Sequence, residues 1–173
     1  MRHPERKSEY KDMLQAVMPI KDKLYRYAFN ILGNRMAAED VVQEVFVKVW
    51  SKKEHLATVD NKEAWCMTVT RNLALDKRRK NGHRHEAVED HYSLADKGMT
   101  PFEVTKSSDT MSMIMEAIQE LPEDQQQVVH LRDVEGYSYN EIAEITGLTL
   151  DKVKVYLHRA RITLRNKLVS LYK

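Results

Sequence analysis

The apolar residues of this chain recur at helical spacing, and glycine is confined to places where that pattern breaks. Leu24, Tyr27, Ala28 and Ile31 follow the i, i+3, i+4, i+7 spacing of a helix that buries one face. The chain has only five glycines, and each lies in or beside a break, as expected where glycine ends a helix at positive φ. Alternating apolar and polar stretches of strand length are missing from the sequence. The pattern therefore predicts an all-α protein.

Breaks in this pattern divide the chain into helical segments and one long gap. The segments lie at about residues 9–32, 35–53, 62–80, 113–121, 122–134, 138–146 and 150–171. Pro19 should kink the first segment or divide it in two, and we expect a loop at residues 55–61. The pattern fails from residue 81 to about residue 108, which is a polar stretch. We therefore predict two small helical domains and a flexible linker, at residues 9–82, 109–173 and 83–108 respectively.

Each helical segment should bury one apolar stripe against its neighbours. In the second segment we expect burial of Val41, Val42, Val45, Phe46, Val49 and Trp50. In the third we expect burial of Trp65, Val69 and Leu73. In the last segment the stripe consists of Val153, Leu157, Ala160, Leu164, Leu168 and Leu171.

Charge is distributed unevenly along a chain whose net charge is +2. Residues 71–85 hold six bases and one acid, and residues 150–173 hold seven bases and one acid. Residues 116–144, in contrast, hold eight acids and one base. Two separate basic stretches in a nearly neutral protein indicate local contacts with a polyanion.

Several functional classes are disfavoured by composition. No apolar run approaches the roughly 18 residues that a membrane span requires, and the polar residues 1–10 do not resemble a signal peptide. The single cysteine, Cys66, cannot form an internal disulfide, which favours a reducing, cytoplasmic setting. The chain also lacks a phosphate-binding glycine loop. We expect no membrane insertion, no cofactor, no small-molecule substrate and no enzymatic activity.

The segment from Ser138 to Arg161 has the pattern of a helix-turn-helix. Ser138 can cap the first helix, and Glu141, three residues later, completes a capping box. Gly147 allows the tight turn, and Thr149 can cap the second helix. The positions that face the core or fill the corner between the helices are Ile142, Ala143, Ile145 and Leu148.

The second helix of this motif leaves a basic face uncovered. Its residues that the core does not need are Lys152, Lys154, Val155, His158, Arg159 and Arg161. Lys154, Val155 and His158 share one face, which can enter a DNA major groove. Lys152 and Arg161 are better placed to meet phosphates. A solvated basic face of a helical bundle is the alternative, but the complete turn pattern before this helix favours DNA binding.

Two further surfaces lie in the amino-terminal part of the chain. The second segment carries a mixed face at i, i+3, i+4, i+7, i+8, formed by Asp40, Gln43, Glu44, Val47 and Lys48. Such a face suits a helical protein partner, although on spacing alone an ordinary exposed polar face is the simpler interpretation. The third segment joins a polar loop to a basic track, formed by Thr58, Val59, Asp60, Asn61, Arg71, Asn72, Arg78 and Arg79. Surfaces of this kind bind single-stranded DNA and can hold a flipped base in a pocket. Because Trp65 lies in the apolar stripe, we favour core packing over base stacking for it.

Together these segments resemble the extracytoplasmic-function (ECF) sigma factors of bacterial RNA polymerase. Residues 25–34 and 38–50 are similar to regions 2.1 and 2.2 of that family. Residues 64–79 are similar to regions 2.3 and 2.4, and the chain from Leu121 onward is similar to region 4. The resemblance covers about residues 10–82 and 109–171, and it excludes the linker sequence.

The resemblance implies a role for each surface. The face around Asp40 and Glu44 is implied to contact the clamp helices of the largest polymerase subunit. The loop 58–61, together with the basic track, is implied to read and melt the −10 promoter element. The uncovered face of the last helix is implied to meet the −35 element, although Val155 and His158 depart from the family consensus, so no −35 preference can be transferred. In this family the linker threads toward the active-site cleft, and an anti-sigma factor is an expected partner.

Two rival hypotheses fit parts of the sequence. An autonomous helix-turn-helix regulator would bind duplex DNA without polymerase and would use its amino-terminal domain as a sensor. A metal-dependent protein is the second, because six possible ligands crowd together: His83, His85, Glu86, Glu89, Asp90 and His91. Metal ligands need a rigid frame and outer-shell support. Since this stretch has the pattern of a linker, we expect no metal site.

Overall fold

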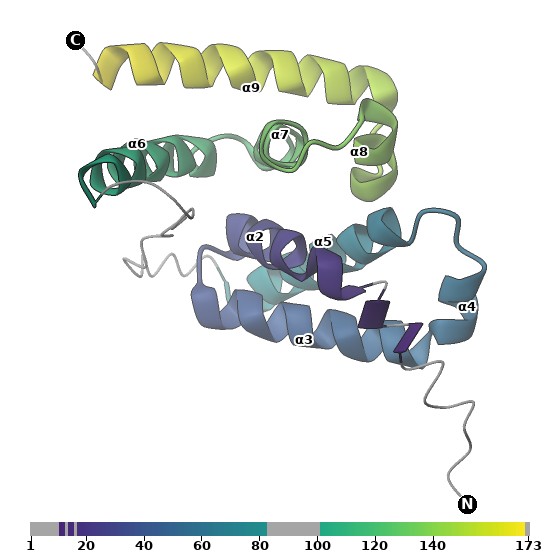
Figure 1. The fold of residues 1–173 in the computed structure, drawn as a ribbon. Helices are drawn as coiled ribbons and strands as arrows, with labels where there is room; N and C mark the ends of the chain where they lie inside the picture. Colours follow the sequence, from purple (N-terminus) through teal and green to yellow (C-terminus); the bar gives the residue numbers. More distant parts are fainter. Residues whose placement is uncertain (1–10, 13, 16, 83–100, 172–173) are drawn as a thin grey trace, which may run out of the picture.

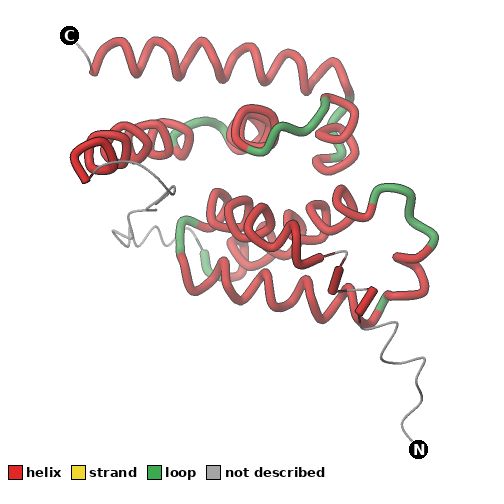
Figure 2. The backbone as a smooth tube through the Cα atoms, viewed as in Figure 1, coloured by secondary structure: helices red, strands yellow, loops and turns green. Residues whose placement is uncertain are grey.

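The computed structural model describes residues 11–12, 14–15, 17–82 and 101–171. Within these ranges the chain forms helices and no strands, as the all-α prediction requires (Figure 2). The helices make two bodies that stack on each other (Figure 1). The amino-terminal body contains α2 to α5, and the carboxyl-terminal body contains α6 to α9.

The amino-terminal body follows the predicted segments closely. Its elements are η1 (Met18–Ile20), α2 (Lys21–Leu32), α3 (Arg35–Ser51), α4 (Lys53–Ala57) and α5 (Lys62–Lys80). Pro19 lies in the 3₁₀ turn that precedes α2, so it divides the first segment as predicted. Leu24, Tyr27, Ala28 and Ile31 are buried, which confirms the stripe from which the helical pattern was inferred.

The loop predicted at residues 55–61 is shorter than expected, because α4 extends to Ala57. Leu56 is buried in the core and anchors this short helix. The predicted burial of Trp50 is wrong: its side chain is 43% exposed. The ammonium of Lys53 lies 5.5 Å from the centre of the indole ring, so the ring has a cation–π contact at the surface.

The burial predicted for α5 also needs correction. Trp65, Val69 and Leu73 are only partly buried at the edge of the core. Ala64, Met67 and Ala74 are among the fully buried residues instead. The reason is that α5 packs against three helices, α2, α3 and α8, and these neighbours bury the side of α5 opposite the one that carries Trp65, Val69 and Leu73. Trp65 still packs against the core.

The carboxyl-terminal body consists of α6 (Pro101–Gln119), α7 (Glu123–Val129), the π-helical turn η2 (His130–Val134), α8 (Tyr139–Thr146) and α9 (Leu150–Leu171). Helix α6 begins at Pro101, so the linker predicted at residues 83–108 is wrong in its last eight residues. Proline suits the first position of a helix, because its φ is already helical and that position needs no N–H donor. Residues 83–100 lie outside the described residues.

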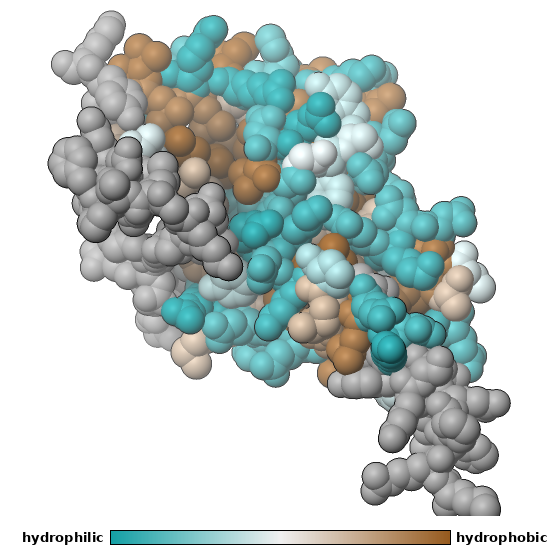
Figure 3. Space-filling view, in the orientation of Figure 1, coloured by the Kyte–Doolittle hydropathy of each residue, from teal (hydrophilic) through white to brown (hydrophobic). Residues whose placement is uncertain are grey.

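Apolar surface on the face drawn in Figure 3 gathers over α6 and the carboxyl-terminal half of α9. Ile114 and Met115 of α6 and Leu164 of α9 are partly buried and pack against the core. Among the helices in the described part of the chain, none is long and apolar enough to cross a membrane.

Candidate nucleic-acid interface

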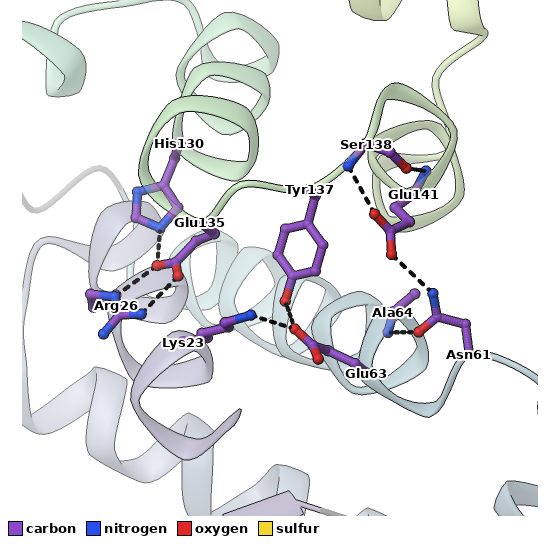
Figure 4. A network of polar contacts seen from close by, with 10 residues as sticks. All are labelled: Lys23, Arg26, Asn61, Glu63, Ala64, His130, Glu135, Tyr137, Ser138 and Glu141. Atoms are coloured by element: carbon purple, nitrogen blue, oxygen red, sulfur yellow. Dashed lines mark hydrogen bonds and ion pairs between the residues drawn. The ribbon is translucent and has the colours of Figure 1, made fainter. Parts of the chain in front are cut away.

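The helix-turn-helix predicted from Ser138 to Arg161 is present in α8 and α9. The Glu141 N–H donates to Ser138 Oγ (3.2 Å), and the Ser138 N–H donates to Glu141 Oε2 (2.8 Å), which completes the capping box (Figure 4). The backbone hydrogen bond from Ser138, and then the one involving its side chain, lower the pKa of Glu141. Gly147 ends α8 at φ +73°, and the Lys152 N–H donates to Thr149 Oγ1 (3.3 Å).

The outer face of α9 is exposed and basic. The structure exposes all six residues predicted for this face, namely Lys152, Lys154, Val155, His158, Arg159 and Arg161. Val153, Leu157 and Ala160 point the other way and are buried. Helix α9 lies on the side of the molecule farthest from α3 (Figure 1). This face is therefore accessible from outside while the two bodies are packed together.

Arg161 differs from the other five because it already has an ion-pair partner. Its guanidinium meets the carboxylate of Asp133 in η2 through two atom pairs, Nε–Oδ2 (3.0 Å) and Nη2–Oδ1 (2.5 Å). The hydrogen bond to Asp133 raises the pKa of Arg161. A phosphate contact by Arg161 would have to compete with this bidentate pair.

The predicted partner-binding face on α3 is also exposed. Asp40, Gln43, Glu44, Val47 and Lys48 all reach the surface, and Val47 is 66% exposed.

Two residues beside this face were not predicted to belong to it from the sequence. Lys77 of α5 lies 3.3 Å from Asp40 Oδ2 and 4.0 Å from Glu44 Oε1. Met36 is 76% exposed one turn before Asp40, and its i, i+4 spacing to Asp40 was the signal that could have added it.

The loop and basic track predicted to hold single-stranded DNA do not form one compact pocket. Asn61 and Arg79 lie near opposite ends of the 19-residue helix α5, and such a helix is about 28 Å long. Asn72 and Arg79, seven residues apart, are exposed on one side of the helix. In the loop, Thr58 and Asp60 are exposed and Val59 packs against the core.

The other three predicted track residues contact the carboxyl-terminal body. Arg71 Nε donates to Gln127 Oε1 (2.6 Å). Arg78 forms an ion pair with Glu123. Asn61 Nδ2 donates to Glu141 Oε1 (3.3 Å), while its Oδ1 caps α5 by accepting from the Ala64 N–H (2.9 Å) (Figure 4). The sequence carried no sign of these contacts, because each joins residues 45 to 80 positions apart.

A polar cluster joins the two bodies beside these contacts (Figure 4). Both oxygens of Glu135 accept from Arg26, through Nε and Nη2, each at 2.8 Å. His130 Nε2 lies 3.3 Å from Glu135 Oε1. Burial by itself would raise the pKa of Glu135, but the Arg26 hydrogen bonds and the contact with His130 outweigh it and lower the pKa to about 2. Glu135 is therefore ionised at neutral pH.

A second interdomain contact involves Glu63 of α5. The hydroxyl of Tyr137 donates to Glu63 Oε1 (2.6 Å), and Lys23 Nζ donates to the same oxygen (2.8 Å). Burial, followed by the hydrogen bond to Glu63, raises the pKa of Tyr137, so its hydroxyl keeps the proton that it donates.

The described residues show neither a metal site nor a reactive thiol. No group of three or more His, Cys, Asp or Glu side chains in the described residues is placed to hold a metal ion. The cluster from His83 to His91, singled out above as a possible metal site, lies outside those residues. Burial, with a smaller effect from Glu63, raises the pKa of the Cys66 thiol to about 12. A buried, protonated thiol is a poor nucleophile.

Two helical bodies, one of which carries a helix-turn-helix with an exposed basic face, define a DNA-binding protein. The chain matches the Sigma-70 region 2 family over residues 16–84 and the Sigma-70, region 4 family over residues 111–164. The chain belongs to the ECF RNA polymerase sigma factors. Sigma factors are regulatory proteins that act in transcription initiation.

Individual relatives agree with this assignment. The chain is 34% identical to the ECF RNA polymerase sigma factor SigE of Mycolicibacterium smegmatis, with 86% of this chain and 58% of SigE covered. It is 33% identical to SigL of Mycobacterium tuberculosis, with 86% and 84% covered. The chain thus spans a little over half the length of SigE and most of SigL.

Among solved structures, the sigma factor RpoE in complex with the anti-sigma factor NepR from Bartonella quintana has a similar fold. The TM-score is 0.72 and the sequence identity 26%, with 91% of this chain and 97% of that chain covered.

Proposed function

We propose that this protein binds core RNA polymerase, recognises the −35 and −10 promoter elements and promotes DNA melting, without being an enzyme. The observation that carries the proposal is the exposed basic face of α9 above a fully capped helix-turn-helix. A sigma factor acts where the polymerase is, so we propose a cytoplasmic site of action. Each domain would have its own role: the amino-terminal domain was proposed at residues 9–82, and the carboxyl-terminal domain, proposed at residues 109–173, begins with α6 at Pro101.

The carboxyl-terminal domain would bind the −35 element as duplex DNA. Lys154, Val155 and His158 are exposed on one side of α9, where they can reach base edges in the major groove, with Arg159 beside them. Lys152 lies at the amino-terminal end of α9, where a base and the helix terminus together suit a phosphate. Arg161 would join them only after it leaves Asp133.

The amino-terminal domain would capture the −10 element as it opens. Asn72 and Arg79 are exposed on one side of α5, and Thr58 and Asp60 are exposed in the loop before it. Unstacking a base costs on the order of a few kcal/mol. Contacts between the basic track and the released strand would offset that cost, so no nucleotide hydrolysis is needed.

The polymerase would bind the exposed face of α3. Val47 is an exposed apolar contact flanked by Glu44 and Lys48, and Met36 adds a second exposed apolar side chain one turn before Asp40. An apolar centre with a charged rim is typical of protein interfaces. We also propose an anti-sigma factor as partner, since the similar RpoE of Bartonella quintana is seen in complex with the anti-sigma factor NepR.

The test is run-off transcription with sigma-free bacterial core polymerase and a pool of promoter fragments, with and without this protein. Protein-dependent initiation at fragments that share a −35/−10 pair is the expected result. Tight duplex binding by the protein alone, without initiation, would instead favour the autonomous regulator.

The −10 assignment has its own test. Neutralising Arg78 and Arg79 should impair open-complex formation more than polymerase binding. Because Arg78 also pairs with Glu123, Arg79→Gln alone is the cleaner variant. Lys21→Gln, which removes an exposed base from α2, is its matched control. Equal losses of polymerase binding and open-complex formation in Arg79→Gln would contradict the assignment.

A further inference from the structure

We propose that Asp133 limits the affinity of α9 for DNA of any sequence, because its carboxylate holds the Arg161 guanidinium that would otherwise meet a phosphate. Asp133 lies in η2, outside the helix-turn-helix of residues 138–161. It acts through Arg161 and is therefore a positioning residue. The inference rests on the proposed function of α9 in binding duplex DNA.

The first support is the place of Arg161 on α9. Arg161 follows Lys154 by seven positions and His158 by three, so the three residues share one side of the helix. All three are exposed, and the Arg161 side chain is 49% exposed. A duplex bound by Lys154 and His158 would therefore bring its phosphate backbone within reach of Arg161.

The second support is the geometry of the ion pair. Nε and Nη2 of Arg161 meet the two carboxylate oxygens of Asp133 at 3.0 Å and 2.5 Å. The planar fork of a guanidinium binds phosphate in the same way as carboxylate. Asp133 thus occupies an edge of Arg161 that a phosphate would use, and it cancels a positive charge that would otherwise release counterions from DNA.

The third support is that the turn around Asp133 is fixed from both sides. On one side, Arg132 Nη1 donates to the Tyr137 carbonyl oxygen (2.8 Å). On the other side, Glu135 accepts two hydrogen bonds from Arg26, and its side chain is 1% exposed. The Asp133 carboxylate is therefore held beside α9 by its neighbours, and little conformational entropy is lost when it binds Arg161.

Stabilisation of the fold is the alternative role for this pair, and its exposure argues against that role. The Asp133 side chain is 38% exposed and that of Arg161 is 49% exposed, and ion pairs at such positions add little stability. Helix α9 is anchored instead by the buried side chains of Val153, Leu157 and Ala160. The main consequence of the pair is the loss of one positive charge from the exposed side of α9.

A weaker sequence-independent contact is useful to a protein that must find a particular site. Phosphate contacts position a protein on DNA but carry no sequence information, and non-specific sites far outnumber specific ones in a genome. With Arg161 held by Asp133, less protein is retained on non-specific DNA. A larger share of the binding free energy then comes from base contacts by Lys154, Val155 and His158.

The decisive test is a double-mutant cycle of Asp133→Asn and Arg161→Gln in the full chain. The probe is a labelled duplex of random sequence, and its binding is followed by fluorescence anisotropy at several salt concentrations. Asp133→Asn should tighten binding and steepen the slope of log K against log salt by about 0.9, so that its advantage over wild type falls about 3.5-fold between about 50 and about 200 mM salt. In the Arg161→Gln background, the same substitution should leave the slope unchanged.

Two further variants control this experiment. Glu144→Gln removes another exposed acid from the same body and should leave the slope unchanged. Asp133→Ser removes the Asp133 carboxylate through a different side chain and should repeat the Asp133→Asn result. Circular dichroism identifies any variant that fails to fold.

The outcomes separate this inference from the proposed function. An unchanged slope in the folded Asp133 variants would overturn the inference. An equal gain in affinity with and without Arg161 would also overturn it, since Asp133 would then act by repelling phosphates directly. Weaker binding by Asp133→Asn would overturn it in favour of a carboxylate that orients Arg161 toward DNA. Failure of wild-type protein to start transcription on core polymerase would count against the proposed sigma function, whereas the cycle on random duplex would still report the effect of Asp133.

Discussion

Removal of the Glu135 charge should abolish a defined part of the pH dependence of stability. The pKa of this carboxyl is lowered from 4.5 to about 2 in the folded protein. A depressed carboxyl pKa stabilises the fold above the unfolded value and loses that contribution as pH falls toward the folded value. Since one pKa unit corresponds to about 1.36 kcal/mol, the contribution is at most about 3 kcal/mol at pH 7. About 2 kcal/mol of it should be lost by pH 3.

The assay is urea unfolding of wild type and Glu135→Gln, followed by circular dichroism at pH 7 and pH 3. The variant should be less stable than wild type at pH 7, and the gap should shrink by about 2 kcal/mol at pH 3. Other carboxylates titrate in both proteins, so the comparison cancels them. Glu144→Gln, at an exposed position of α8, should show no such narrowing. A gap of equal size at both pH values would refute the assignment of Glu135 as the buried partner of Arg26.

Three further predictions concern the turn and the two exposed faces. Gly147→Ala should destabilise the protein by about 1–2 kcal/mol, because φ is +73° at this residue. A Cβ there would meet no atom within 4 Å, so backbone strain is the sole expected cause of the loss. An unchanged melting temperature would contradict that strain. Lys152→Gln should weaken duplex binding and reduce the slope of log K against log salt by about one, as measured by anisotropy at several salt concentrations. An unchanged slope would argue against the phosphate contact proposed for Lys152. Val47→Lys should weaken binding to core polymerase while leaving duplex binding unchanged, which a pull-down and an anisotropy titration would test together.

Local features of the fold were predictable because their causes lie within a few residues. The capping box of Ser138 and Glu141, the left-handed Gly147 and the span of α5 each depend on neighbours in sequence. The exposed face of α9 was likewise predictable from helical spacing, since the residues on the opposite side of the helix are apolar. Errors occurred where distant contacts decide burial. Trp50 has the spacing of a core residue, yet it lies where α3 reaches the surface.

The sequence by itself determined the helices, the turn chemistry and the candidate residues on each face, because spacing along a helix sets which side chains share a side. Only the tertiary structure decided which of those residues are available. Arg71 and Arg78 carry the same charge as Arg79, but they meet Gln127 and Glu123 of the other body, whereas Arg79 stays at the surface. The partners of Arg26 and Asn61 lie 109 and 80 residues away. Such pairings depend on how two bodies pack, and local periodicity carries no information about that packing.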